Sequence, residues 1–165
     1  MKKNESAAID FPLWQLFYRS FWAANKVREK ELGPYDITPR QSAVLRLIVR
    51  LGDRATPGEI SRQLFVEAHT MSEQINRLEK DGLVMRVKDL SRKNLVRIAL
   101  TKKGQGLYRK SLNQKSIEVI FSGLTEQEKL QFWAVLAKIR EKAVKKLGIK
   151  NLDLYPPSDP ADLHE

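Results

Sequence analysis

The feature that most constrains the fold of this chain is a change of hydrophobic period after Gly82. Before this glycine, apolar residues recur at three- and four-residue spacing, as from Val44 to Leu51, which is typical of amphipathic helices. After it, residues 83–88 and 95–100 are rich in β-forming residues, and the polar residues between them are typical of a hairpin tip. The sequence therefore predicts several short helices followed by a two-stranded antiparallel ribbon.

Capping signals predict where the inner helices begin and end. Thr38 and Gln41 form a capping box with proline at the first helical position, and Thr56 and Glu59 repeat the same pattern. Gly82 is expected to end the last helix before the ribbon. The predicted inner helices are residues 39–51, a short helix from residue 57 with Ile60 and Leu64 facing inward, and residues 68–81 with Met71, Ile75 and Leu78 facing inward.

Longer helices are predicted on both sides of this central part. Asp10 can cap a helix that accepts Pro12 in its first turn. Thr101 can cap another, and a capping box at Thr125 and Glu128 begins the last one. These helices are expected over residues 11–32, 101–123 and 125–147, and the acidic, proline-containing residues 149–165 are expected to form a tail that buries little.

The charge of the chain favours a polyanionic partner. The 165 residues include 30 Lys and Arg against 20 Asp and Glu, which gives a net charge of +10. Residues 68–110 hold eleven Lys and Arg but only four Asp and Glu, so the excess is concentrated in the predicted ribbon and the helices beside it. Because such a charge attracts phosphate, the sequence favours nucleic acid over a membrane as the partner.

Several classes of protein are excluded by what the sequence lacks. The absence of cysteine excludes disulfides, thiolate metal sites and cysteine redox switches. His69 and His164 are far apart, so we expect no metal and no cofactor. We find no phosphate-binding loop or nucleophile motif, so we expect no enzyme. With no apolar run of about 18 residues and no apolar region after residues 1–4, a cytoplasmic protein is expected.

The order of the predicted elements and two short motifs resemble the MarR family of bacterial and archaeal transcription regulators. Residues 77–84, Arg-Leu-Glu-Lys-Asp-Gly-Leu-Val, resemble the end of the family's recognition helix, and residues 100–104, Leu-Thr-Lys-Lys-Gly, resemble the turn that leaves the wing. The sequence differs from the family pattern at Glu67, where a serine cap is common, and at Glu73, where an arginine or similar residue often faces DNA. Its wing is also shorter than usual.

The resemblance implies a mainly α fold with a small β-hairpin wing: a winged helix-turn-helix lobe with long N- and C-terminal dimerisation helices. The resemblance also implies a homodimer that is held together by the first helix and the last two helices. The implied parts are an N-terminal dimerisation helix (1–36), a DNA-binding lobe (37–100), C-terminal dimerisation helices (101–148) and the acidic tail (149–165).

A DNA-binding face is predicted on the helix over residues 68–81. With its apolar residues turned inward, polar side chains that can pair with bases or phosphates point outward. Positive residues at the hairpin tip extend this face. The candidate DNA-binding residues are His69, Thr70, Ser72, Glu73, Asn76, Arg77, Arg92 and Lys93. The alternative interpretation is an ordinary solvated helix in which Glu73 pairs with Arg77.

The first predicted helix has an aromatic stripe that gives a further candidate site; it is formed by Trp14, Phe17, Tyr18, Phe21 and Trp22. Aromatic residues at helical spacing mostly pack in a core or a dimer interface. In the MarR family, small aromatic effectors often bind between the dimerisation helices and the DNA-binding lobe, so the resemblance implies an effector site near Trp14, Tyr18 and Trp22.

The expected function is that of a sequence-specific regulator that binds double-stranded DNA as a homodimer on an inverted-repeat operator and is released by a small aromatic effector. The alternative is a winged-helix module that binds a protein partner and has no specific affinity for DNA.

Overall fold

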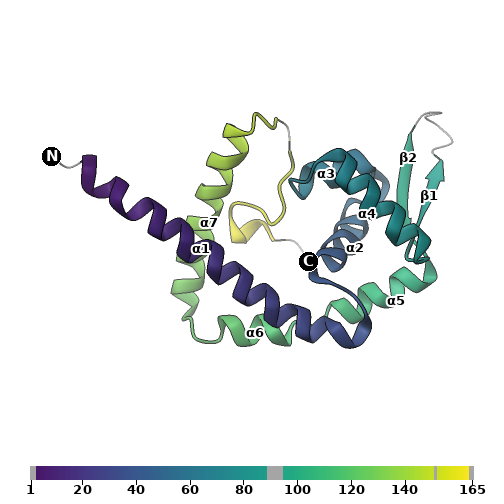
Figure 1. Cartoon of the computed structure of the whole chain (residues 1–165), viewed down its shortest axis with the longest axis horizontal. Coiled ribbons are helices and arrows are strands. Elements are labelled where there is room, and N and C mark those ends of the chain that lie inside the picture. The colour runs from purple at the N-terminus through teal and green to yellow at the C-terminus, as the bar shows by residue number, and fades with distance from the viewer. Residues whose placement is uncertain (1–2, 89–94, 151, 164–165) are drawn as a thin grey trace.

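The computed structural model describes residues 3–88, 95–150 and 152–163, with side chains from residue 8 onward. Its elements are α1 (Lys3–Leu32), α2 (Pro39–Leu51), α3 (Pro57–Gln63), α4 (Ala68–Lys80), β1 (Val84–Lys88), β2 (Val96–Leu100), α5 (Lys102–Ser111), α6 (Lys115–Phe121) and α7 (Glu126–Lys146), with 3-10 turns at Gly33–Tyr35, Gly52–Arg54 and Pro160–Asp162. Figure 1 shows α2 to α4 and the strands in one lobe, α1 and α7 on the other side, and α5 and α6 connecting the two.

The lobe is built around one hydrophobic core, as the helical spacing predicts. The apolar faces of α2, α3 and α4 meet the inner face of the ribbon, and Ile60, Met71, Ile75 and Leu78 are fully buried. The strands pair antiparallel with Val84 opposite Leu100. These elements confirm the predicted winged helix-turn-helix fold, with the helix and strand boundaries of the lobe within a residue or two of those expected.

The ribbon is tied to α5 by a close backbone approach at Gly104. The Thr101 hydroxyl donates to the carbonyl of Gly82 at 2.6 Å, and the Thr101 amide donates to the carbonyl of Leu83 at 3.1 Å. A Cβ atom on Gly104 would lie 1.9 Å from the Leu83 carbonyl oxygen. The glycine is therefore required for α5 to leave the wing in this direction.

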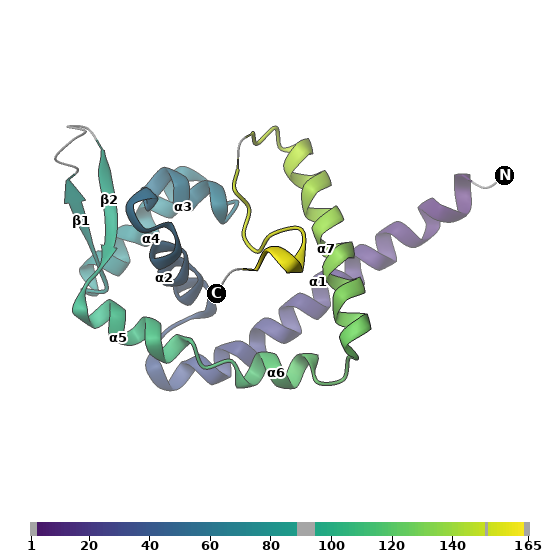
Figure 2. The same cartoon turned by 180° about the vertical axis from the view of Figure 1, so that it is seen from behind.

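The start of α1 differs from the prediction. The helix begins at Lys3 rather than Phe11, so Asp10 is not its cap and Pro12 lies in the helix interior. Alanines at positions 7 and 8 favour the helical conformation upstream of the proline, whose ring removes one backbone hydrogen bond without ending the helix. Figure 2 shows that this N-terminal part of α1 extends well beyond α7.

The single helix predicted over residues 101–123 is wrong, because the structure has α5 and α6 with a break between them. Both ends at the break are satisfied by side chains from α1. Arg28 donates to the carbonyls of Ser111 and Asn113, and the Glu31 carboxylate accepts from the amide and the hydroxyl of Ser116. Backbone groups that would be unpaired at a helix break are thus paired here.

The C-terminal segment, residues 149–150 and 152–163, is the predicted tail; its side chains are exposed or half-buried, yet it contacts the rest of the chain. In Figures 1 and 2 the C-terminal segment turns back and lies between α7 and the lobe. It contacts both sides: Trp133 Nε1 of α7 donates to the Ser158 carbonyl at 3.0 Å, and the Arg50 guanidinium of α2 lies 3.5 Å from the Tyr155 ring centroid. Polar and cation–π contacts thus hold this segment against both α7 and the lobe.

The capping-box predictions hold at two of three helices. Complete capping boxes begin α2 at Thr38 and α7 at Thr125. At α3 the Thr56 hydroxyl accepts from the Glu59 amide, but the Glu59 carboxylate accepts from Arg62 and Gln63 instead of turning back. The expected second half of that box is therefore missing.

Candidate DNA-binding surface

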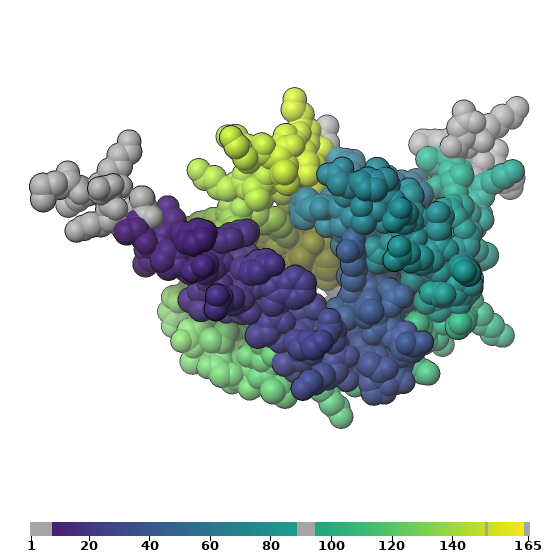
Figure 3. All heavy atoms as spheres, in the orientation of Figure 1, coloured from purple at the N-terminus to yellow at the C-terminus, as the bar shows by residue number. Residues whose placement is uncertain are grey.

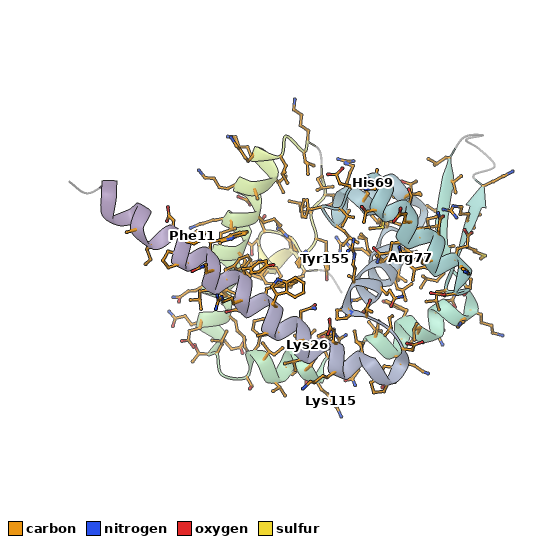
Figure 4. The ribbon with its side chains drawn as sticks, in the orientation of Figure 1. Phe11, Lys26, His69, Arg77, Lys115 and Tyr155 are labelled. Carbon is orange, nitrogen blue, oxygen red and sulfur yellow. The ribbon has the colours of Figure 1, made fainter. Side chains whose placement is uncertain are left out.

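The six candidate residues of α4 lie on the surface of the lobe, opposite its buried face. His69, Glu73, Asn76 and Arg77 are exposed, while Thr70 and Ser72 are half-buried. Figure 4 shows His69 near the beginning of α4 and Arg77 further along it. The helix thus presents hydrogen-bond donors and acceptors of the kinds that pair with base edges in a major groove.

The ion pair that the alternative interpretation requires is present but weak. Arg77 Nη2 lies 3.9 Å from Glu73 Oε2, and these side chains are 78% and 66% exposed. An exposed pair at this spacing contributes about 0.3–0.5 kcal/mol. It therefore leaves both side chains accessible to a partner.

Two further contacts flank the exposed face of α4, and sequence reasoning identified neither. On the side of α2, Arg40 Nε donates to Gln74 Oε1 at 3.1 Å. On the side of the wing, Arg86 of β1 donates to Asn76 Oδ1 at 2.7 Å and also pairs with Glu79. The sequence signal for Arg86 is only its outward position in a strand, because its partners depend on how the ribbon folds against α4.

Two further basic residues, Lys103 and Lys88, lie near the ribbon and differ in their contacts. Lys103 Nζ donates to the carbonyl of Asp81 at 2.8 Å and so supports the C-terminal end of α4. Lys88 is exposed at the end of β1, where it adds positive charge to the wing. The wing-tip candidates Arg92 and Lys93 lie outside the described residues.

The part of the chain that the structure describes has neither a cluster of metal-binding side chains nor a membrane-spanning helix. Within residues 3–88, 95–150 and 152–163, no group of three or more His, Asp or Glu side chains is placed to hold a metal ion. None of the helices described there is both long and apolar enough to cross a membrane.

The aromatic residues of α1 form an exposed row. The Trp14 and Tyr18 rings lie 6.4 Å apart, the Tyr18 and Trp22 rings 6.0 Å apart, and each of the three residues is more than half exposed. Figure 3 shows α1, in purple, along one side of the molecule, and Figure 4 labels Phe11 on this helix.

An apolar cavity of 670 Å³ lies between α1, α7, the C-terminal segment and the turn after α3. Its walls include Phe17, Phe65, Phe121, Phe132, Trp133 and Pro156. The predicted effector residues Trp14, Tyr18 and Trp22 are not among the residues that line it. Of the aromatic stripe, Phe17 lines the cavity, and the Trp14 ring lies 6.1 Å from the Phe17 ring.

Comparison with known sequences gives related transcriptional regulators. Residues 35–93, which span α2 to the wing, match the family model described as MarR family. The uncharacterized HTH-type transcriptional regulator YsmB of Bacillus subtilis (strain 168) is 32% identical over 117 residues, which cover 70% of this chain and 80% of that protein.

Comparison with solved structures gives the same fold. The organohalide-sensing regulator RdhR-CbdbA1625 in its ligand-free form has a TM-score of 0.82 at 24% identity, covering 95% of this chain and 94% of that one. A mutant of MarR from E. coli, complexed with operator DNA, has a TM-score of 0.72 at 26% identity, covering 78% of this chain and 93% of that one.

Proposed function

Because this chain belongs to the MarR family of HTH-type transcription regulators, we propose that it binds an inverted-repeat operator as a homodimer, with α4 of each protomer in the major groove. The observation that carries the proposal is the exposed polar face of α4, formed by His69, Thr70, Ser72, Glu73, Asn76 and Arg77 beside the basic wing. In such dimers the two half-sites lie about 10–10.5 base pairs apart, centre to centre.

The proposed dimer interface is formed by α1, α6 and α7. These helices carry large apolar side chains that are 41–70% exposed in the single chain, among them Phe11, Phe21, Val119, Phe132 and Val135. Exposed apolar surface of this extent on a monomer is unusual and marks an interaction surface. We assign the dimerisation role to residues 1–36 and 101–148 and the DNA-binding role to residues 37–100.

We also propose that a small aromatic molecule acts as the effector. The support is the cavity lined by Phe17, Phe121 and Trp133, because it also touches Phe65 in the turn between α3 and α4. A ligand in contact with both parts could shift the lobe relative to the dimerisation helices. Trp14, Tyr18 and Trp22, on the same helix as Phe17, remain candidates for contacting it.

The central experiment is binding of the native chain to a duplex site selected in vitro from randomised DNA, measured by fluorescence anisotropy against random DNA. We expect a dimer of twice the 19.0 kDa chain mass in sedimentation velocity and a clear preference for the selected site. The Asn76→Ala and Arg77→Ala variants should each weaken the selected site by about 1–3 kcal/mol if that residue reads a base. A monomer, or equal affinity for both DNAs, would contradict the proposal and favour a protein-interaction module.

The wing is tested separately through salt dependence. If Arg92 and Lys93 contact phosphates, each releases about one condensed counterion on binding. The Arg92→Ala, Lys93→Ala double variant should then show a slope of log affinity against log salt that is less steep by about 2. An unchanged slope would remove the wing tip from the proposed DNA-binding residues.

A further inference from the structure

One arginine of the wing contacts the exposed face of α4 at two residues. Arg86 Nη2 donates to Asn76 Oδ1 at 2.7 Å, and Nη1 pairs with Glu79 Oε2. The Arg86 amide also donates to Glu79 Oε1 at 3.2 Å. The Glu79 carboxylate therefore binds both the backbone amide and the guanidinium of Arg86, while Nη2 of the same guanidinium contacts the Asn76 amide.

This contact fixes which end of the Asn76 amide faces outward. A guanidinium has only donors, so the atom that it contacts must be the carbonyl oxygen and not the nitrogen. The Nδ2 group is left at the exposed face of α4, and within the described part of the chain it has no hydrogen-bond partner. Asn76 is thereby presented as a donor.

The orientation changes which base Asn76 can read. An asparagine that recognises adenine uses both ends of its amide, accepting from N6 and donating to N7. Here Oδ1 accepts from Arg86. The oxygen has a second lone pair, but the guanidinium N–H groups beside it repel the amino group of an approaching adenine. Guanine instead presents two neighbouring acceptors, N7 and O6, and no donor, so it accepts from the Nδ2 group without this repulsion.

We propose that Arg86 determines the base specificity of α4 by holding Asn76 as a donor, so that Asn76 reads guanine rather than adenine in each half-site. This inference rests on the proposed placement of α4 in the major groove. Glu79 neutralises the charge of Arg86, and both side chains are only about one-third exposed, 36% for Arg86 and 37% for Glu79. The arrangement therefore suits positioning of Asn76 better than a phosphate contact by Arg86.

The experiment measures the affinity of the native chain for the selected duplex with each of the four base pairs placed in turn at every half-site position. The position read by Asn76 is the one at which the Asn76→Ala variant loses discrimination. We expect the native chain to bind guanine there at least about fivefold more tightly than adenine, since a specific base contact is worth about 1–3 kcal/mol. A preference for adenine or thymine at that position would overturn the inference. So would a result in which Asn76→Ala loses discrimination at no position of the half-site.

Arg86→Met tests whether the arginine sets this preference. The variant should bind guanine and adenine within about twofold of each other, because no guanidinium beside Oδ1 then repels the amino group of adenine. In the Asn76→Ala background, Arg86→Met should leave the ratio between guanine and adenine unchanged, since the two residues act as a unit. An equal loss of affinity for all four base pairs would instead make Arg86 a phosphate contact and overturn the inference.

Arg86→Lys is the second variant, in case Arg86→Met does not fold. It keeps a positive charge beside Glu79 but lacks the forked donors, so it should also reduce the preference for guanine. Lys88→Met, at an exposed position of the same strand, is the matched control and should leave the preference intact. If the native chain binds no selected duplex better than random DNA, the proposed function fails. If it binds specifically but Arg86→Lys keeps the full preference, only the present inference fails.

Discussion

Arg28 in α1 donates a hydrogen bond of 2.6 Å from its Nη2 atom to the main-chain carbonyl of Ser111, at the end of α5. The same guanidinium pairs with Glu31, and the Arg28 and Glu31 side chains are only 12% and 11% exposed. Glu31 in turn accepts from Ser116 at the beginning of α6. The Arg28–Glu31 pair therefore joins α1 to the break between α5, which leaves the lobe, and α6, which belongs to the proposed dimer interface.

Removal of Arg28 should destabilise the fold strongly. In Arg28→Met, the carbonyls at the helix break lose their donor and the Glu31 carboxylate loses its partner, so the free energy of unfolding should fall by about 2–4 kcal/mol. The measurement is urea unfolding at a fixed protein concentration, because dimerisation contributes to apparent stability. Lys26→Met is the control: it breaks an exposed pair with Glu29 in the same helix and should cost less than about 0.5 kcal/mol. Equal effects of the two substitutions would contradict this role of Arg28.

The contribution of Glu31 to the free energy of unfolding should depend on pH. Burial by itself would raise the pKa of Glu31, but hydrogen bonds from Ser116 and Arg28 and the charge of Arg28 outweigh it and lower this pKa below its ordinary value. The unfolded chain then takes up the proton first as the pH falls, so the stabilisation is present above the ordinary glutamate pKa and is lost as the pH falls through the lowered one.

Comparison of the native chain with Glu31→Gln tests this dependence. The difference in free energy of unfolding should be largest near pH 7 and should shrink below about pH 4.3. Glu118→Gln removes an exposed carboxylate from α6 and serves as the control, with a small effect expected near pH 7. A difference for Glu31→Gln that stays constant from pH 7 to pH 3 would show that its charge does not stabilise the fold.

The sequence predicted the lobe well because its signals are local. Thr38, Gly82 and Thr101 fix helix ends through contacts with residues close in the chain, and the apolar spacing of α4 identifies its buried face. The break after Ser111 could not be predicted, because the Arg28 side chain that satisfies it lies 83 residues away. The fold of the C-terminal segment depends in the same way on distant partners.

For the candidate site, the sequence predicted four exposed residues of α4 correctly, whereas Thr70 and Ser72 are half-buried, and it did not predict how the side chains are paired. His69, Asn76 and Arg77 follow from the position of the buried residues on the opposite face. The contact between Arg86 and Asn76 depends on how the ribbon packs on α4, which hydrophobic period does not specify. The orientation of the Asn76 amide was therefore open until the fold was known.

Gly104 should tolerate no side chain. In Gly104→Ala the new Cβ would overlap the Leu83 carbonyl, so the ribbon and α5 must separate, and a loss of at least about 2 kcal/mol in unfolding free energy is expected. Gly106, in the same helix, has open space around it, and Gly106→Ala should stabilise the chain by about 0.5–1 kcal/mol. Thermal and urea unfolding of both variants measure the difference, and destabilisation of equal size in both would contradict the close approach.

The C-terminal segment should be held locally by Tyr155. Tyr155→Ala removes the ring beneath Arg50, a contact worth about 1 kcal/mol, so amide hydrogen exchange over residues 152–163 should become about fivefold faster. Figure 4 shows this side chain in the space between the segment and the lobe. Asp153→Asn, which weakens an exposed 3.5 Å pair with Arg54, should change exchange little. Unchanged exchange in Tyr155→Ala would mean that other contacts hold the segment.

The most direct test of the central claim is recovery of genomic DNA fragments by the purified native chain, followed by sequencing. The account predicts that the recovered fragments share an inverted repeat with half-sites about 10–10.5 base pairs apart, centre to centre. It also predicts that the Asn76→Ala, Arg77→Ala double variant enriches no such repeat. Recovery of fragments without a common sequence, equally by the native chain and the double variant, would contradict the claim that α4 reads DNA sequence.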